Sequence, residues 1–114
     1  MAVVTGRVTL GSTGLNSYNL GIQPTWARFE IVSDDCISLG NADGTRQNVL
    51  YKYNDTSTKD SDSFNTHVIK LMGYVGGSFV PIVEASFSAF TATGVQLNVT
   101  QANASYRLHI TCGN

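Results

Sequence analysis

Charged side chains are scarce in this sequence. Asp, Glu, Lys and Arg make up 13% of its 114 residues, and the formal net charge is −1, whereas about a quarter of a typical soluble domain is charged. Without a surplus of either sign, the composition argues against nucleic acid or an anionic membrane surface as a partner. The scarcity of charge also favours a surface that is partly covered in a larger assembly.

Cysteine and long apolar runs are nearly absent too. Two cysteines, Cys36 and Cys112, are too few for a disulfide framework, so we expect small buried thiols and leave their pairing open. No run is long enough to cross a bilayer, and the first residues lack the pattern of a secretory signal. We therefore expect synthesis in the cytoplasm, no membrane insertion, and unmodified sequons at Asn54, Asn98 and Asn103.

Helical periodicity is missing, and strand patterns take its place. No stretch keeps apolar residues at helical spacing for three turns, but runs of β-branched and aromatic residues end at Gly, Asn, Asp or Ser. A shorter piece near Cys36–Leu39 is expected to add an edge strand. The predicted strands are Val3–Leu10, Trp26–Val32, Asn48–Tyr53, Asn65–Tyr74, Phe79–Phe90, Val95–Thr100 and Tyr106–Cys112.

Seven or eight short strands in one domain, residues 1–114, predict an all-β fold: an antiparallel β-sandwich or a jelly-roll-like barrel. Gly44, Gly77 and Gly94 are expected to supply the positive φ that tight turns need. Alternation within the strands predicts which side chains face the core. These are Phe29, Ile31, Val49, Tyr51, Val83, Phe87, Val95, Leu97, Val99, Leu108 and Ile110.

Two segments invite a more specific prediction. Residues Gly94–Thr111 read as strand, short polar turn and strand, which predicts a terminal hairpin whose apolar side closes the core. The polar stretch Asn54–Asn65 predicts an exposed loop or hairpin tip. Its carboxylates are weak calcium candidates, because their spacing is not that of a calcium-binding loop. These carboxylates belong to Asp55, Asp60 and Asp62.

No motif in the sequence carries catalysis. A G-x-S-x-G elbow is absent, and Asp34 and Asp35 precede Cys36, where they would raise the thiol pKa rather than lower it. His67 and His109 have no second ligand at metal-binding spacing. The two neighbouring aspartates fit a turn better than a paired acid and base. We therefore expect a protein that is not an enzyme and holds no metal or cofactor.

Aromatic residues are the remaining candidates for a binding site. Trp26 shares one strand face with Arg28, so the indole is expected outside the core. Tyr53 and Tyr74 lie near strand ends, where sugar-binding proteins place stacking platforms. These four residues are the predicted ligand-binding set. The alternative is that they pack at the rim of the fold or at a subunit interface.

Two segments toward the ends of the chain resemble a known family. They read TGLNSYNLGIQPTWARFEI, which includes a polar strand, and ASFSAFTATGVQLNVTQANASYRLHITC. Within the second, Phe90–Thr100 resembles the F-x-x-x-G-F-x-L-N-hydrophobic-T ending of small β-sandwich domains in structural proteins of tailed phages and prophages. Gly21–Pro24 resembles the GFQP element of those domains. Ile22 and Val95 stand where an aromatic residue is usual.

This resemblance implies a non-enzymatic structural protein of a tail fibre, tail tip or capsid surface. It would sit in the virion after synthesis in the host cytoplasm, as a symmetric homo-oligomer, a trimer above all, beside other virion proteins. Val80, Ile82 and Phe90 are then expected to pack between subunits. A tail-fibre-type protein would bind a host receptor, for instance a surface glycan. The alternative is a lectin-like carbohydrate-binding module that works on its own.

Overall fold

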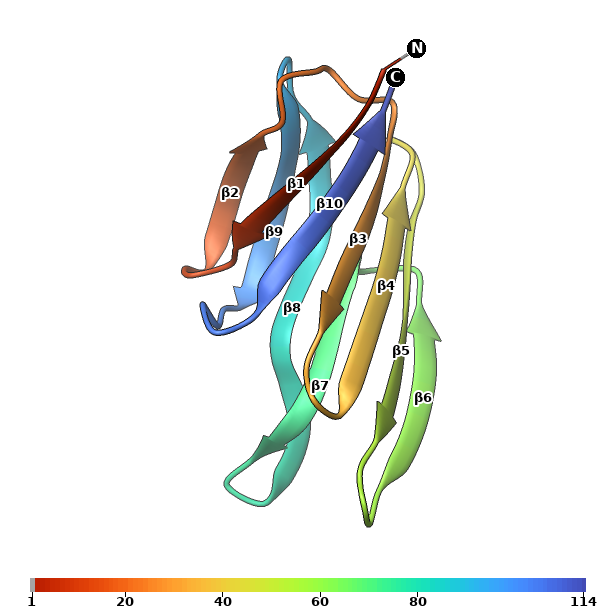
Figure 1. Ribbon diagram of the computed structural model, residues 1–114, viewed down its shortest axis with the longest axis vertical. Helices are drawn as coiled ribbons and strands as arrows, with labels where there is room; N and C mark the ends of the chain where they lie inside the picture. Colours follow the sequence, from red (N-terminus) through yellow and green to blue (C-terminus); the bar gives the residue numbers. More distant parts are fainter. Residues whose placement is uncertain (1) are drawn as a thin grey trace.

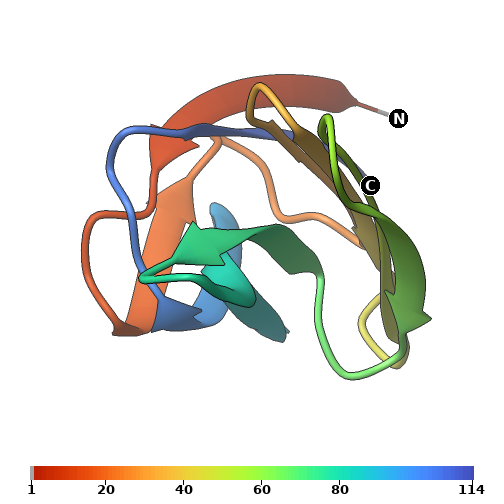
Figure 2. The same ribbon diagram turned by 90° about the horizontal axis from the view of Figure 1, so that it is seen from below.

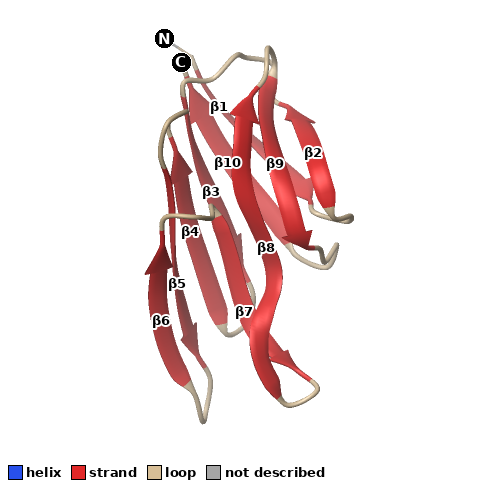
Figure 3. Cartoon of the chain, turned by 180° about the vertical axis from the view of Figure 1, so that it is seen from behind, coloured by secondary structure: helices blue, strands red, loops and turns tan. Residues whose placement is uncertain are grey.

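The computed structural model describes residues 2–114, which form ten strands (Figures 1 and 3). In that range no helix is long and apolar enough to span a membrane. All strand pairs are antiparallel. The strands are β1 (Val3–Thr9), β2 (Gly14–Asn19), β3 (Trp26–Val32), β4 (Cys36–Ala42), β5 (Gln47–Asn54), β6 (Lys59–Phe64), β7 (Ile69–Val75), β8 (Ser78–Phe90), β9 (Gly94–Gln101) and β10 (Arg107–Gly113).

The strands build two sheets that face each other, as Figure 2 shows from below. The six-stranded sheet has the order β1-β10-β3-β4-β5-β6, and the four-stranded sheet has the order β2-β9-β8-β7. The molecule measures 45 × 23 × 21 Å. Both chain ends lie together at one end of the long axis (Figure 1), where the backbone N–H of Asn114 donates to the carbonyl of Ala2 at 3.2 Å. The predicted sandwich is confirmed.

Strand alternation places the core where the sequence pattern predicts it. Because successive side chains point to opposite faces, the apolar positions of β3, β5, β9 and β10 meet between the sheets. Phe87 is the exception, since it is only half-buried and packs on Phe90 with ring centroids 4.7 Å apart. The predicted core residues that are buried are Phe29, Ile31, Val49, Tyr51, Val83, Val95, Leu97, Val99, Leu108 and Ile110.

The prediction of a terminal hairpin is wrong. β9 lies in the four-stranded sheet and pairs with β2 and β8, while β10 lies in the six-stranded sheet between β1 and β3. The segment between them therefore crosses from one sheet to the other instead of turning back on itself. Each strand closes the core from its own side, which explains why both have one fully buried apolar face.

Three other strand predictions change in the structure. β4 is longer than the expected edge piece and lies inside its sheet, between β3 and β5. β2, which the resemblance includes only as a polar strand, pairs with β9 along its whole length. The polar stretch at residues 54–65 is a hairpin tip, as predicted, but its second half is the edge strand β6.

The inward side chains of β4 are small, and this lets the edge of β7 lie against them. Cys36, Ser38 and Gly40 alternate on the buried face of the strand. The Ser38 hydroxyl accepts the backbone N–H of Lys70 at 2.9 Å, and the Cys36 sulfur accepts that of Met72 at 3.4 Å. The opposite sheet therefore supplies hydrogen-bond acceptors to the free edge of β7. At most sheet edges a further strand would have to supply them.

Gly94 has a different role from the predicted one. Gly44 and Gly77 have the positive φ expected of them, but Gly94 does not. A Cβ at Gly94 would lie 1.9 Å from the carbonyl oxygen of Tyr18, so the position needs glycine because two backbones approach closely.

The exposed apolar side chains are not those expected between subunits. Val80, Ile82 and Phe90 are half-buried, and the last two pack against the core. Instead, four aliphatic side chains lie side by side on the outer face of β3, β4 and β5, where Val32 pairs with Ile37 and Leu39 with Leu50. We call these four residues, which are 38–57% exposed, the aliphatic patch.

Candidate ligand-binding site

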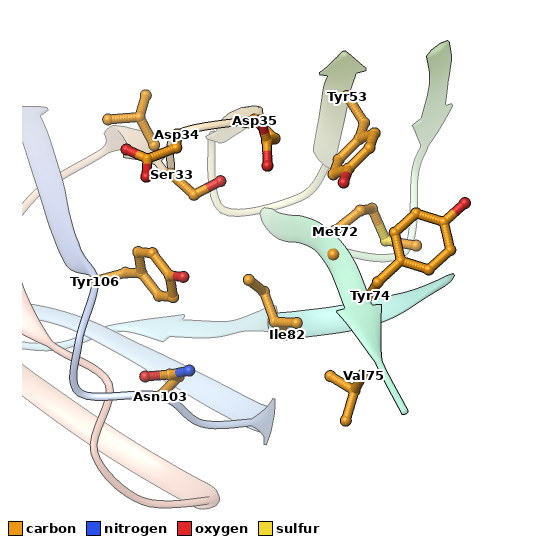
Figure 4. Close-up of a pocket in the computed structure, with 12 residues that line it drawn as sticks. Ser33, Asp34, Asp35, Tyr53, Met72, Tyr74, Val75, Ile82, Asn103 and Tyr106 are labelled. Atoms are coloured by element: carbon orange, nitrogen blue, oxygen red, sulfur yellow. The ribbon is translucent and has the colours of Figure 1, made fainter. Parts of the chain in front are cut away.

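A cleft of about 660 Å³ lies between the two sheets (Figure 4). This volume is within the range of about 300–1,000 Å³ that is usual for small-molecule sites. The segments that line the cleft, among them the β3–β4 turn, are in the half of the molecule away from the chain termini (Figure 1). One wall comes from the β3–β4 turn and β5, the other from β7, β8 and the β9–β10 connection. We call this feature the distal cleft.

A bulge in β8 shapes the floor of the distal cleft. The register of β7 and β8 shifts after Leu71, so that Met72 pairs with Pro81 and Ile82 is the extra residue. Proline has no N–H to donate and is tolerated in a strand at such a bulge. A bulge redirects a side chain, and Ile82 lies at the centre of the lining residues in Figure 4. The cleft therefore has an apolar floor.

Tyr53 and Tyr74, two of the predicted ligand-binding residues, lie together at one side of the distal cleft. Their ring centroids are 6.1 Å apart in an edge-on arrangement. Tyr53 is buried and donates its hydroxyl to Asp55 at 2.8 Å. This hydrogen bond, together with burial, raises the pKa of Tyr53 to about 12. Tyr74 is 48% exposed and bonds to Thr58 at 2.9 Å, so it is the one that offers a ring to a ligand.

The opposite side of the distal cleft carries polar groups. Tyr106 and Asn103 come from the β9–β10 connection. Figure 4 shows both on the same side of Ile82, with Tyr106 directed toward it. The Asn103 side-chain oxygen accepts the backbone N–H of Ser105 at 3.0 Å. Its amide nitrogen is therefore left to donate into the cleft.

Two carboxylates lie at the rim of the distal cleft. Asp34 and Asp35 are exposed in the β3–β4 turn, which confirms that they sit in a turn. None of the side-chain hydrogen bonds and ion pairs among residues 2–114 involves their carboxylates. The cleft thus combines ring faces, an amide donor, a phenol and carboxylate acceptors on an apolar floor, which are the groups that hold a polyhydroxylated ligand.

Trp26 and Arg28, the other two predicted ligand-binding residues, lie elsewhere. Both are on the outer face of β3, where Trp26 covers Gly113 and Arg28 comes within 4.0 Å of Glu30. The indole is outside the core, as the alternation predicts, but half-buried. The structure therefore divides the predicted set between the distal cleft and the six-stranded sheet.

The calcium candidates do not converge. Within the described residues, no group of three or more His, Cys, Asp or Glu side chains could hold a metal ion. Asp55 accepts the backbone N–H groups of its own turn, and Asp60 accepts the hydroxyl of Tyr51 at 2.6 Å. Asp62 lies one residue pair further along β6. Protein hydrogen bonds use both oxygens of Asp55 and one oxygen each of Asp60 and Asp62.

The nucleophile candidates lie apart from the distal cleft or lack a reactive environment. Cys36 and Cys112 are free and buried, and burial raises the pKa of both thiols, which keeps them protonated. His67 lies in the connection between β6 and β7, 3.7 Å from Glu84. Burial lowers its pKa. His109 is exposed on the six-stranded sheet.

Tyr106 and Asn103 were not among the predicted site residues. Alternation assigns Tyr106 to the apolar face of the last strand, and Asn103 falls in a polar turn, so neither stands out in the sequence. The signal that points to the site is Pro81 inside a long strand pattern, because proline there indicates a bulge.

The two motifs that carry the phage resemblance contribute no lining residue to the distal cleft. The GFQP-like element at Gly21–Pro24 links β2 to β3, and Phe90–Thr100 covers the end of β8 and most of β9. The resemblance therefore remains a basis for proposals about function. Comparison with known family models, with curated protein sequences and with solved structures gave no match to this chain.

Proposed function

We propose that this chain is a non-enzymatic structural component of a phage or prophage virion that binds a host-surface glycan in the distal cleft. Its localisation is then the virion, after synthesis in the host cytoplasm. A tail-fibre-type role fits better than capsid decoration, because a tail fibre must present a binding site away from its attachment. The sequence resemblance supports the place of the protein in a virion, and the distal cleft supports the binding of a glycan.

The single observation that carries the binding role is the position of the distal cleft. Both termini are at one end of a 45 Å molecule, and the segments that line the cleft lie in the half away from that end. Attachment through either terminus leaves the cleft free to meet a large ligand. Loops held by a rigid sandwich are where binding sites commonly lie.

The lining of the distal cleft suits a sugar. The exposed ring of Tyr74 provides an apolar face for the C–H side of a pyranose. Asn103 donates, Tyr106 donates or accepts, and Asp34 and Asp35 accept, so that hydroxyls around the ring find partners.

The aliphatic patch supports assembly into a homo-oligomer, with a trimer favoured by the resemblance. Four adjacent aliphatic side chains that are exposed on one sheet face are typical of a surface that another protein covers. A stable oligomer with a mass near three times 12.2 kDa would distinguish a virion component from the alternative, a lectin-like module that acts as a monomer.

Binding to immobilised bacterial surface glycans tests the proposal. Tyr74→Ala removes the exposed ring and Tyr106→Phe removes one hydroxyl, and each is expected to weaken binding at least tenfold. Trp26→Ala is the matched control, since it removes an aromatic side chain from the other predicted location. Loss of binding in Trp26→Ala alone would move the site to the outer sheet face and refute the cleft.

The same glycans test the absence of catalysis. After long incubation with the protein, their masses are expected to be unchanged. The two carboxylates of the distal cleft, Asp34 and Asp35, are neighbours in one exposed turn, so they do not flank a glycosidic bond as the paired carboxylates of glycosidases do. Cleavage that persists in a highly purified sample and disappears in Asp34→Asn or Asp35→Asn would overturn the non-enzymatic assignment.

A further inference from the structure

The charge of the distal cleft is one-sided. Among its lining residues are two carboxylates, Asp34 and Asp35, and no lysine, arginine or histidine. A cleft lined by one sign of charge concentrates ligands of the opposite sign. An anionic sugar, such as a uronic or sialic acid, would meet repulsion without any cation to offset it.

The two carboxylates are not used to build their turn. In the β3–β4 turn the Ser33 hydroxyl accepts the backbone N–H of Cys36 at 3.0 Å. In the two other turns that carry an aspartate, the carboxylate itself accepts the backbone N–H groups of the turn. Asp43 accepts those of residues 45 and 46, and Asp55 accepts those of residues 57 and 58. Asp34 and Asp35 are thus adjacent like charges with no structural partner.

Aromatic ring faces reinforce the preference for a cation. Tyr74 and Tyr106 line the same cleft as the two carboxylates, from opposite sides (Figure 4). The face of an aromatic ring attracts an ammonium group within about 6 Å of its centroid. Carboxylates and ring faces together form a site that favours a protonated amine over a neutral acetamide.

We infer that the distal cleft selects a cationic ligand, and that its occupant is an oligosaccharide with a free, protonated amino group. This inference rests on the proposed glycan-binding function and narrows it to one chemical class. The amine lies at the Asp34–Asp35 rim, and the sugar ring lies over Ile82 between Tyr74 and Tyr106.

Two disaccharides of the same backbone separate the classes. The full chain is titrated at pH 6, below the pKa of an amine, with the β-1,4-linked glucosamine disaccharide and with its N,N′-diacetylated form. Binding is followed through backbone amide chemical shifts. We expect the free amine to bind at least tenfold more tightly, with shifts at residues 32–35, 72–75 and 103–106, and to weaken as salt is raised.

Charge variants complete the test. Asp34→Asn with Asp35→Asn is expected to abolish the preference for the amine. Glu30→Gln combined with Asp62→Asn removes the same charge outside the cleft and is expected to keep the preference for the amine. A preference that survives the first pair, or is lost equally in both pairs, would overturn the inference.

The remaining outcomes separate this inference from the proposed function. Equal or tighter binding of the diacetylated sugar in the distal cleft would refute the selection of a cation and leave glycan binding intact. If neither disaccharide binds, the inference fails, and the proposed function then depends on the wider set of surface glycans.

Discussion

At the scale of single residues, the small side chains of β4 decide how closely the two sheets can approach. Gly40 lies under the backbone of Val68, and a Cβ there would be 1.8 Å from the Val68 carbonyl oxygen. The obstacle is backbone rather than a flexible side chain, so the sheet itself would have to move. Glycine is required here for space and not for φ.

Gly40→Ala is therefore expected to destabilise the fold by about 3 kcal/mol or more, at the upper end of what overpacking costs. Chemical denaturation measures the loss in the free energy of unfolding. A variant that is too unstable to purify would also fit this expectation. Gly11→Ala is the control, because its nearest neighbour would be 3.9 Å away. Stability of Gly40→Ala within about 0.5 kcal/mol of the parent, the range of ordinary surface substitutions, would contradict this packing.

Ser38 makes the second residue-scale contribution. Its side chain is polar and fully buried, and its hydroxyl accepts the backbone N–H of Lys70 at 2.9 Å. Ser38→Ala leaves that donor without a partner, at an expected cost of about 1–3 kcal/mol. Ser61→Ala, on the exposed strand β6, is expected to change the free energy of unfolding much less. Equal effects of the two would show that the hydrogen bond contributes nothing.

At the scale of elements, a polar cluster ties together three strands of the four-stranded sheet. Lys70 on β7 and Thr100 on β9 both bond to the carboxylate of Glu84 on β8. Burial alone would raise the pKa of Glu84, but the hydrogen bonds from Lys70 and Thr100 outweigh it and hold the pKa below its ordinary value. His67 faces the same carboxylate.

The lowered pKa of Glu84 predicts how stability depends on pH. The folded protein binds this proton more weakly than the unfolded chain, so the stabilisation is present above the ordinary pKa of 4.5 and is lost as the pH falls below it. The lowered pKa of His67 adds a loss that begins near pH 6.5 on acidification. Urea unfolding between pH 3 and pH 7 measures both.

Glu84→Gln is expected to be less stable than the parent at pH 7 and to lose less stability on acidification below pH 4.5. Glu30→Gln, which removes an exposed carboxyl from the other sheet, is the control and should keep the parent's acid-side loss. If both variants followed the parent curve, the cluster would not contribute to the pH dependence.

The sequence predicts strand faces better than strand partners. Alternation places Phe29, Leu97 and Ile110 in the core because the period of a strand is fixed by local geometry. Which sheet a strand joins is decided by contacts far apart in the chain. For this reason β9 and β10 look like a hairpin but separate, and β4 is interior rather than an edge.

The distal cleft could be predicted only in part for the same reason. Tyr53 and Tyr74 come together because β5 and β7 meet across the two sheets, which no local pattern shows. Tyr106 and Asn103 join them through the crossing between sheets that the hairpin prediction missed. Alternation places Trp26 on the outer face of β3, and that face belongs to a different surface.

At the scale of the whole molecule, the aliphatic patch predicts self-association. Leu39 lies in the middle of the patch and pairs with Leu50 across β4 and β5. Leu39→Lys is expected to convert a trimer into monomers, because a charge would be buried at the interface. Light scattering after size exclusion measures the mass. Leu15→Lys, the same substitution at a 65% exposed site on the other sheet, is expected to leave the oligomer intact.

Two results would contradict that role for the patch. A parent protein of 12.2 kDa at high concentration would remove the homo-oligomer altogether and favour the free-standing binding module. An oligomer that dissociates in Leu15→Lys and not in Leu39→Lys would place the interface on the four-stranded sheet instead.

The most direct test of the account is a map of where a glycan touches the molecule. Backbone amide shifts of the full chain are recorded during titration with neutral, cationic and anionic bacterial surface oligosaccharides. The account predicts that at least one of them saturates shifts gathered at residues 32–35, 72–75 and 103–106. Shifts centred on Trp26, or no saturable shift with any oligosaccharide, would contradict the distal cleft as a glycan site.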